Sequence, residues 1–157
     1  AIDIQGPGGH SLKEAWSDGP STYLGLMVAG LPNLFMVNGP GSPSVKANMI
    51  VALEQHIDWL MTLLDHLRAT QLNRIEADAQ SQEDWVEHAR EVAEATLMPR
   101  ADSWYVGANI PGKKRVYMPY YGGFDRYSAL CEEIAAEGYR GFKLERRDSP
   151  GPASKAS

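Results

Sequence analysis

Apolar residues recur three and four positions apart through the middle of the chain, which is the pattern of an amphipathic helix. The stripe consists of Met49, Leu53, Ile57, Leu60, Leu64 and Leu67. Upstream of it, Ser42 and Pro43 are typical of an N-cap followed by a first-turn proline. We therefore expect one long helix from this point to about Ala69, with its apolar face toward the core.

Shorter patterns predict further elements on both sides of this helix. Strands are expected at Leu34–Val37, Arg74–Ala77, Val116–Met118 and Phe142–Leu144, which are short apolar or β-branched runs. A short helix is expected from Ser11 to Trp16, and a longer one is expected to open with a Ser81–Asp84 capping box. A last helix is expected to carry Tyr127, Leu130, Cys131 and Ile134 inward and to stop at Gly138. These elements predict an α+β fold.

Composition narrows the class of protein. The chain has 157 residues, of which 43% are hydrophobic, and this is enough for one domain with a core. A formal charge of −5 gives no electrostatic reason to bind nucleic acid or an anionic membrane. A single cysteine, Cys131, suits a reducing compartment, and no apolar run approaches the length of a membrane span. The expected location is cytoplasmic.

Candidate chemistry begins at the junction Val37–Met49, where a predicted strand runs through a Gly-Pro-Gly turn into a predicted helix. Free amides and the positive dipole end make a helix N-terminus suitable for an anion or a polar ring edge. Gly39 and Gly41 would also let a bulky ligand approach the backbone. The residues alone favour an ordinary turn over a ligand site, and they leave both interpretations open.

A second candidate is the loop Ser103–Lys113, whose Pro111 and Gly112 predict a turn. An exposed Trp104 in such a loop could contact a ligand or pack on the core. The basic cluster at residues 113–115 could attract a phosphate, although a solvated run of charge is the simpler interpretation.

Other reactive residues favour packing roles. The four histidines lack the spacing of a helical zinc site, and His56 lies beside the apolar stripe. Cys131 falls on an apolar helix face and is expected to be a core thiol. Asp84 and His88 are four positions apart and are expected to form a surface ion pair. No G-x-S-x-G elbow is present, so a serine hydrolase is unsupported.

Two strings, PNLFMVNGPGSPSVKANM at residues 32–49 and SWYVGANIPGK at residues 103–113, resemble the C-terminal part of Baeyer–Villiger monooxygenases. The resemblance extends from about Ser11 to Leu144. It implies an enzyme that uses FAD, NADPH and O2 to insert one oxygen atom into a ketone, giving an ester or a lactone. It also implies that Met49 contacts FAD, that Trp104 contacts NADP, and that Ser44, Val45 and Met49 line the substrate pocket.

The same resemblance implies the domain organisation. Residues 1–145 would be the C-terminal portion of a discontinuous Rossmann-like FAD-binding domain, with the loop 102–115 covering NADPH. Residues 146–157 are rich in Ser, Pro, Gly and charge, and they are expected to be a disordered tail.

Several features of such enzymes are missing from the sequence. It contains no G-x-G-x-x-G fingerprint for a dinucleotide and no F-x-G-x-x-x-H-x-x-x-W motif, and it begins at an alanine. We therefore expect the last third of an enzyme, without a catalytic residue of its own and inactive when isolated. Its partners would be the missing N-terminal FAD and NADPH regions. The alternative is a non-catalytic interaction module built on the helix of residues 44–69; a flavin N-hydroxylase fits SWYVGANIPGK less well.

Overall fold

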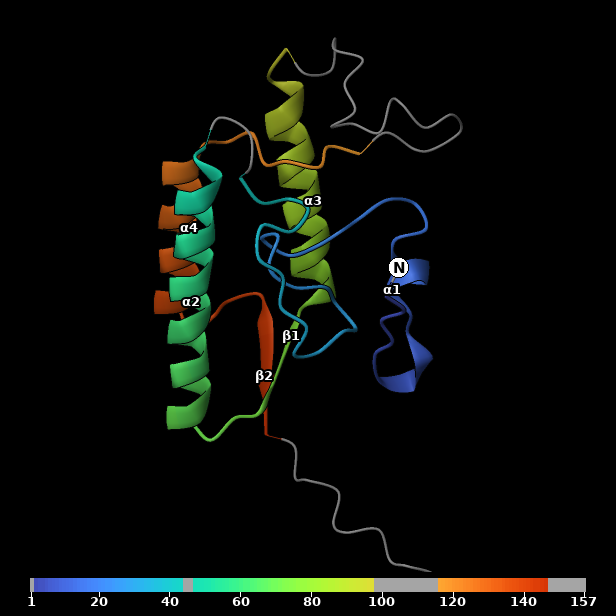
Figure 1. Cartoon of the computed structure of the whole chain (residues 1–157), viewed down its shortest axis with the longest axis vertical. Helices are drawn as coiled ribbons and strands as arrows, with labels where there is room; N and C mark the ends of the chain where they lie inside the picture. Colours follow the sequence, from blue (N-terminus) through green and yellow to red (C-terminus); the bar gives the residue numbers. More distant parts are fainter. Residues whose placement is uncertain (1, 44–46, 98–115, 147–157) are drawn as a thin grey trace, which may run out of the picture.

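The computed structural model describes residues 2–43, 47–97 and 116–146. Helices dominate it, together with one small sheet (Figure 1). In chain order the elements are η1 Pro7–Gly9, α1 Leu12–Ala15, α2 Met49–Ala69, β1 Arg74–Ala77, α3 Ala79–Glu94, α4 Phe124–Ala136 and β2 Phe142–Glu145. The expected α+β class is confirmed. No helix within the described ranges is long and apolar enough to cross a lipid bilayer.

The sheet is formed by β1 and β2, which pair antiparallel with Ile75 opposite Leu144 and Ala77 opposite Phe142. Alternate residues of β1 point inward, and both Ile75 and Ala77 are fully buried. Both strands lie where the sequence predicted them. In Figure 1 the paired helices α2 and α4 lie on one side of this sheet and α3 lies on the other.

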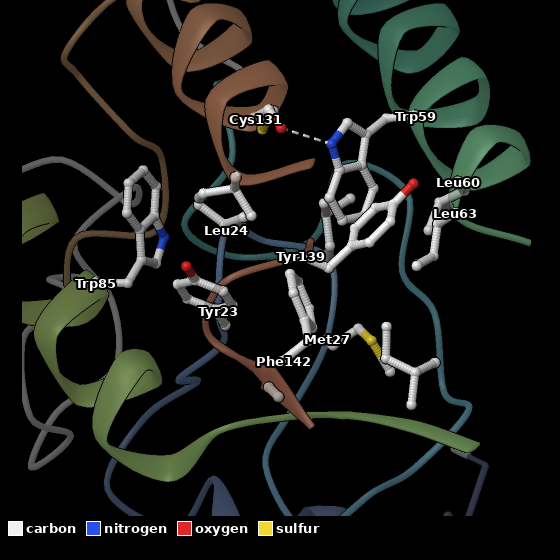
Figure 2. Packing of buried hydrophobic residues seen from close by; sticks show 14 of the residues in the cluster. Tyr23, Leu24, Met27, Trp59, Leu60, Leu63, Trp85, Cys131, Tyr139 and Phe142 are labelled. Carbon is white, nitrogen blue, oxygen red and sulfur yellow. Dashed lines mark hydrogen bonds between the residues drawn. The ribbon is translucent and has the colours of Figure 1, made fainter. Parts of the chain in front are cut away.

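An irregular segment, residues 22–31, fills the centre of the core. Its side chains are almost completely buried, namely those of Thr22, Tyr23, Leu24, Leu26, Met27, Val28 and Leu31. Figure 2 shows how Tyr23, Leu24 and Met27 pack among residues of the helices and of β2. Leu24 has a left-handed φ of 57°, which β-branched or bulky residues adopt only when their surroundings fix it. No periodicity marks this segment.

Two predicted strands are wrong. Residues 34–37 and 116–118 belong to no helix or strand and form no ladder with a neighbouring strand. Their backbone groups bond singly instead: Met36 N–H donates to the Leu26 carbonyl (2.8 Å), and Gly41 N–H donates to the Met118 carbonyl (2.7 Å). These two short apolar runs are therefore linkers: the first is hydrogen-bonded to the buried segment 22–31, and the second is hydrogen-bonded to the Gly-Pro-Gly turn.

Helix α2 ends at Ala69 as predicted but begins at Met49, and Asn48 is its N-cap. The Asn48 side chain accepts a hydrogen bond of 3.0 Å from Ile50 N–H. Ser42 does not cap the helix, because its hydroxyl donates to the Gly39 carbonyl (2.7 Å) and its own carbonyl accepts from Tyr120 N–H (2.9 Å). The predicted start was thus wrong because Ser42 has partners within its own turn and from a distant segment.

The predicted apolar stripe of α2 is partly wrong as well. The buried face consists of Ala52, His56, Trp59, Leu60, Leu63 and Leu67. Of the expected inward residues, Met49, Leu53 and Ile57 are between 41% and 56% exposed. The helix is apolar over a wide arc, and only one side of that arc contacts the described residues.

The remaining helices follow the prediction more closely. Helix α1 is capped by Ser11, whose side chain accepts from Lys13 N–H (3.2 Å). Helix α3 begins after Asp78, whose carboxylate accepts from Ser81 N–H (3.1 Å), so the predicted Ser81–Asp84 box is wrong by three positions. Helix α4 buries Tyr127, Cys131 and Ile134, as expected from the sequence.

Candidate functional site

Of the four residues expected at cofactors or substrate, the structure describes Met49. It is the first residue of α2, and its side chain is 56% exposed. Ser44 and Val45 lie outside the described residues, as do Trp104, the loop 102–115, the cluster 113–115 and the segment 147–157. The described part of the candidate site is therefore the turn before α2 and the first turns of that helix.

The turn of residues 38–42 is fastened to the core at several points. Gly39 N–H donates to the Gly25 carbonyl (3.2 Å), and the Thr22 hydroxyl donates to the Pro40 carbonyl (2.6 Å). The Gly41 carbonyl accepts from the indole N–H of Trp85 (3.2 Å). Since these partners are themselves buried, the turn is a rigid support for the start of α2 and not a free loop.

The glycines of this turn serve internal packing. A Cβ on Gly39 would lie 2.5 Å from the Gly25 carbonyl oxygen, and one on Gly41 would lie 3.1 Å from the indole nitrogen of Trp85. Gly41 also has a left-handed φ of 84°. The expectation that Gly39 and Gly41 open the backbone to a ligand is wrong, because protein atoms occupy those positions.

Asn38 connects the turn to α2 in two ways. Its backbone N–H donates to His56 Nδ1 (3.0 Å), and its side-chain amide donates to the Met49 carbonyl (3.3 Å). Asn38 has a left-handed φ of 54°, a conformation that Asn tolerates better than most residues. Its side-chain oxygen is buried, and no described residue donates to it.

His56 is fully buried and continues the network into α4. His56 Nε2 lies 2.8 Å from the hydroxyl of Tyr127, and that hydroxyl donates to the Leu24 carbonyl (2.6 Å). A backbone N–H can only donate, so Nδ1 must be the acceptor, and Nε2 must carry the proton that it donates to Tyr127. The histidine is thus held as one neutral tautomer, in agreement with the packing role expected from the sequence.

The buried titratable groups near this network are held neutral. Burial lowers the pKa of His56 from 6.5 to about 4. Burial also raises the pKa of the Cys131 thiol to about 12 and the pKa of the Tyr127 hydroxyl well above its usual value. These side chains therefore fix geometry, and Cys131 is the core thiol that its helix face predicted.

The predicted Asp84–His88 pair is wrong. Asp84 accepts a hydrogen bond from the Gln80 amide (2.9 Å), and His88 Nε2 bonds to the hydroxyl of Tyr120 (3.2 Å). The ring of Trp85 packs on both Tyr120 and His88, with 4.9 Å and 5.6 Å between ring centroids. A cleft of about 420 Å³ opens between α3 and α4 here, but Met49 is not among the residues that line it.

Apolar side chains are exposed on the α2 side of the turn. Val37 is 42% exposed, Met49 is 56% exposed and Ile50 is 69% exposed. A flexible, polarizable methionine beside a rigid turn suits contact with a planar aromatic ring. The described residues contain no G-x-G-x-x-G turn of the kind that holds a pyrophosphate.

Sequence reasoning missed Asn38 as the residue that joins the turn to α2. The Asn38-Gly39 dipeptide is itself a turn signal that tolerates left-handed φ, so it could have drawn attention to this position. Nothing in the sequence connects Asn38 with His56, because only the folded chain brings the two together.

The sequence matches no protein-family model. It is 43% identical over 144 residues to the acetone monooxygenase (methyl acetate-forming) of Gordonia sp. (strain TY-5), covering 91% of this chain and 27% of that enzyme. It is 36% identical over 143 residues to the phenazine N-monooxygenase PhzNO1 of Lysobacter antibioticus, covering 91% of this chain and 26% of that enzyme. The chain therefore spans about a quarter of the length of the curated relatives that it matches.

The fold agrees with these sequence matches. An oxidized steroid monooxygenase bound to NADP superposes with a TM-score of 0.84 at 45% identity, covering 92% of this chain and 26% of that one. Sequence and fold thus agree over nearly all of the chain. It belongs to the Baeyer–Villiger monooxygenase family, in which it corresponds to about a quarter of a full-length enzyme.

Proposed function

We propose that this chain is the C-terminal part of an FAD- and NADPH-dependent monooxygenase that inserts one oxygen atom from O2 into a ketone, giving an ester or a lactone. The observation that carries the proposal is Met49, an exposed methionine at the head of α2 in a chain 43% identical to an acetone monooxygenase. In the same proposal, residues 1–145 are the C-terminal portion of a discontinuous Rossmann-like FAD-binding domain, and residues 146–157 form a disordered tail. The enzyme would be cytoplasmic.

The side chains would divide the work as follows. Met49 would contact the flavin ring, and Ser44 and Val45 would form the wall of the ketone pocket with it. Trp104, on the loop 102–115, would contact NADP. When bound, FAD supplies the redox chemistry that activates O2. The chain's own contribution is to position the ring and the ketone and to exclude water, because its described buried groups titrate far from neutral pH.

A test of this proposal needs the complete reading frame. The full-length protein, loaded with FAD, should oxidise NADPH faster in the presence of small ketones and should yield the ester or lactone. The isolated 157-residue chain should produce neither, because the dinucleotide fingerprints are absent from it. A full-length protein whose NADPH oxidation no ketone stimulates would contradict the proposal.

N-oxygenation is a second candidate, because a relative at 36% identity is a phenazine N-monooxygenase. The substrate would then be a heteroaromatic amine, and the same cofactors would serve. A substrate panel of ketones and phenazines distinguishes the two, since one gives esters and the other gives N-oxides. A non-catalytic module built on α2 is the third candidate, and it is supported by the exposed apolar face of that helix.

A further inference from the structure

We propose that His56 is a positioning residue that sets the place of Met49 through Asn38. The inference rests on the proposed function, in which Met49 contacts flavin and ketone. The connection has two bonds, from Asn38 N–H to His56 Nδ1 (3.0 Å) and from the Asn38 amide to the Met49 carbonyl (3.3 Å). It joins the second turn of α2 to the first residue of the same helix through the turn that precedes it.

The arrangement has a fixed direction of hydrogen bonds. The Leu24 carbonyl orients the Tyr127 hydroxyl, that hydroxyl accepts from His56 Nε2–H, and Nδ1 is left as an acceptor for Asn38. The series has a backbone acceptor at one end, the Leu24 carbonyl, and a backbone donor at the other, the Asn38 N–H. Each group between them can therefore donate and accept in only one direction. The bond at Nδ1 is thus the one that holds the Asn38 N–H in one place.

Asn38 needs such a partner because of its backbone. Its φ of 54° is unfavourable for most residues. Its N–H donates to the side chain of His56 and not to a backbone carbonyl of the sheet or of a helix. Without an acceptor at Nδ1, this part-buried N–H would be left unpaired, which is unfavourable. The turn would then shift to recover a partner, and the amide bond to the Met49 carbonyl would shift with it.

Two substitutions separate this role from simple packing. The amide of an asparagine reaches about as far as Nδ1, whereas that of a glutamine reaches about as far as Nε2. His56→Asn therefore keeps an acceptor for Asn38 and loses Tyr127, whereas His56→Gln keeps Tyr127 and loses the acceptor. Tyr127→Phe is the control, because it removes both hydrogen bonds of the Tyr127 hydroxyl, to His56 and to the Leu24 carbonyl, but leaves the bond between Asn38 and His56.

The experiment uses the full-length protein carrying methyl-¹³C methionine, with the Met49 signal assigned by its loss in Met49→Leu. We expect His56→Gln to shift or split the Met49 signal and to change the ratio of kcat/KM for a small and a bulky ketone at least threefold. His56→Asn and Tyr127→Phe should keep the signal and the ratio within twofold of the wild type, although all three variants lower Tm.

An unchanged Met49 signal in His56→Gln, or equal shifts in all three variants, would overturn the proposal and leave His56 as a packing residue. If His56→Gln does not fold, Asn38→Gly tests the same connection, because it keeps the N–H and the left-handed φ but removes the amide bonded to Met49. Failure of the proposed function is recognised separately: the wild type would then oxidise no ketone, while the Met49 signal would still report its position.

Discussion

The indole N–H of Trp59 donates a hydrogen bond of 2.8 Å to the carbonyl of Cys131, and it thereby ties α2 to α4 across 72 positions of sequence (Figure 2). The ring also packs edge-on against Tyr139, with 5.4 Å between ring centroids. Together with the bond between His56 and Tyr127, this contact joins the two helices, while the described sheet has only two short strands.

Replacing Trp59 by Phe should weaken this pairing. The loss of the indole donor leaves the Cys131 carbonyl without that partner, and we expect a local destabilisation of about 1–3 kcal/mol. Native-state hydrogen exchange of the α2 and α4 amides in the full-length protein would measure it. Thr62→Ala, on the exposed side of the same helix, is the control and should leave exchange unchanged. Equal protection in both variants would show that packing alone joins the helices.

The folded protein should lose stability as the pH falls below 6.5. Burial lowers the pKa of His56 to about 4 from the 6.5 of the free side chain. Between these values the unfolded chain binds more protons than the folded one, so the stability present above pH 6.5 is lost progressively toward pH 4. The difference in pKa corresponds to a loss of up to about 3 kcal/mol. Urea unfolding at several pH values would measure the slope.

His56→Asn is the control for this pH dependence. The variant should be less stable at pH 7, but its stability should fall less steeply between pH 6.5 and 4. The same steep fall in the variant would mean that other groups, such as paired carboxylates, dominate the response to acid.

The isolated chain should have an exposed apolar surface on α2. Ile50, Leu53, Ile57 and Met61 are each more than 40% exposed and lie at spacings of three and four. Contiguous apolar patches of this kind mark surfaces that contact other protein. We therefore expect the isolated chain to associate and to become more soluble on Ile57→Lys. Because it lacks the dinucleotide fingerprint, we also expect it to bind FAD weakly or not at all. In the full-length protein the same substitution should lower Tm.

These opposite effects of Ile57→Lys are measured by light scattering of the isolated chain and by thermal unfolding of the full-length protein. Thr62→Lys, at an exposed polar position of α2 away from these four side chains, is the matched control and should affect neither. A purified isolated chain that is monomeric and carries stoichiometric flavin would contradict the prediction.

Local patterns predicted elements wherever local chemistry decides the structure. Strands β1 and β2, helix α4 and the end of α2 follow from propensity, periodicity and a terminal glycine. The start of α2 does not, because Ser42 has the residue type of an N-cap but finds its partners in Gly39 and Tyr120. Nor does the buried irregular segment 22–31, whose structure depends on contacts with residues far away in sequence.

The candidate site could likewise be predicted only in part. A methionine at the head of a helix can be recognised in the sequence, and the structure places Met49 there with its side chain exposed. The network that supports it joins residues 18 positions apart from Asn38 to His56 and 71 positions apart from His56 to Tyr127. The periodicity of a sequence shows which face of a helix is apolar, but not which distant residue a side chain will contact. These hydrogen-bond partners therefore could not be predicted.

Val45 should control which ketones the full-length enzyme accepts. We propose that it lines the pocket beside Met49, so Val45→Phe should disfavour bulky ketones more than it slows NADPH oxidation with small ones. A methylene-sized change in an apolar pocket is worth about 1–3 kcal/mol of discrimination. The ratio of kcat/KM for two ketones measures this. If the ratio is unchanged while flavin content falls, Val45 is a folding residue.

Trp104 should affect the nucleotide and not the core. In the proposed enzyme its indole lies against NADP, where a broad apolar face and one N–H donor can hold a ribose or a ring. Trp104→Ala in the full-length enzyme should raise KM for NADPH about tenfold, equivalent to about 1.4 kcal/mol. It should also release more hydrogen peroxide per NADPH oxidised, since a loosely held nucleotide shields the flavin less. Tm should change little. A lower Tm with normal NADPH kinetics and normal coupling would instead identify Trp104 as a packing residue.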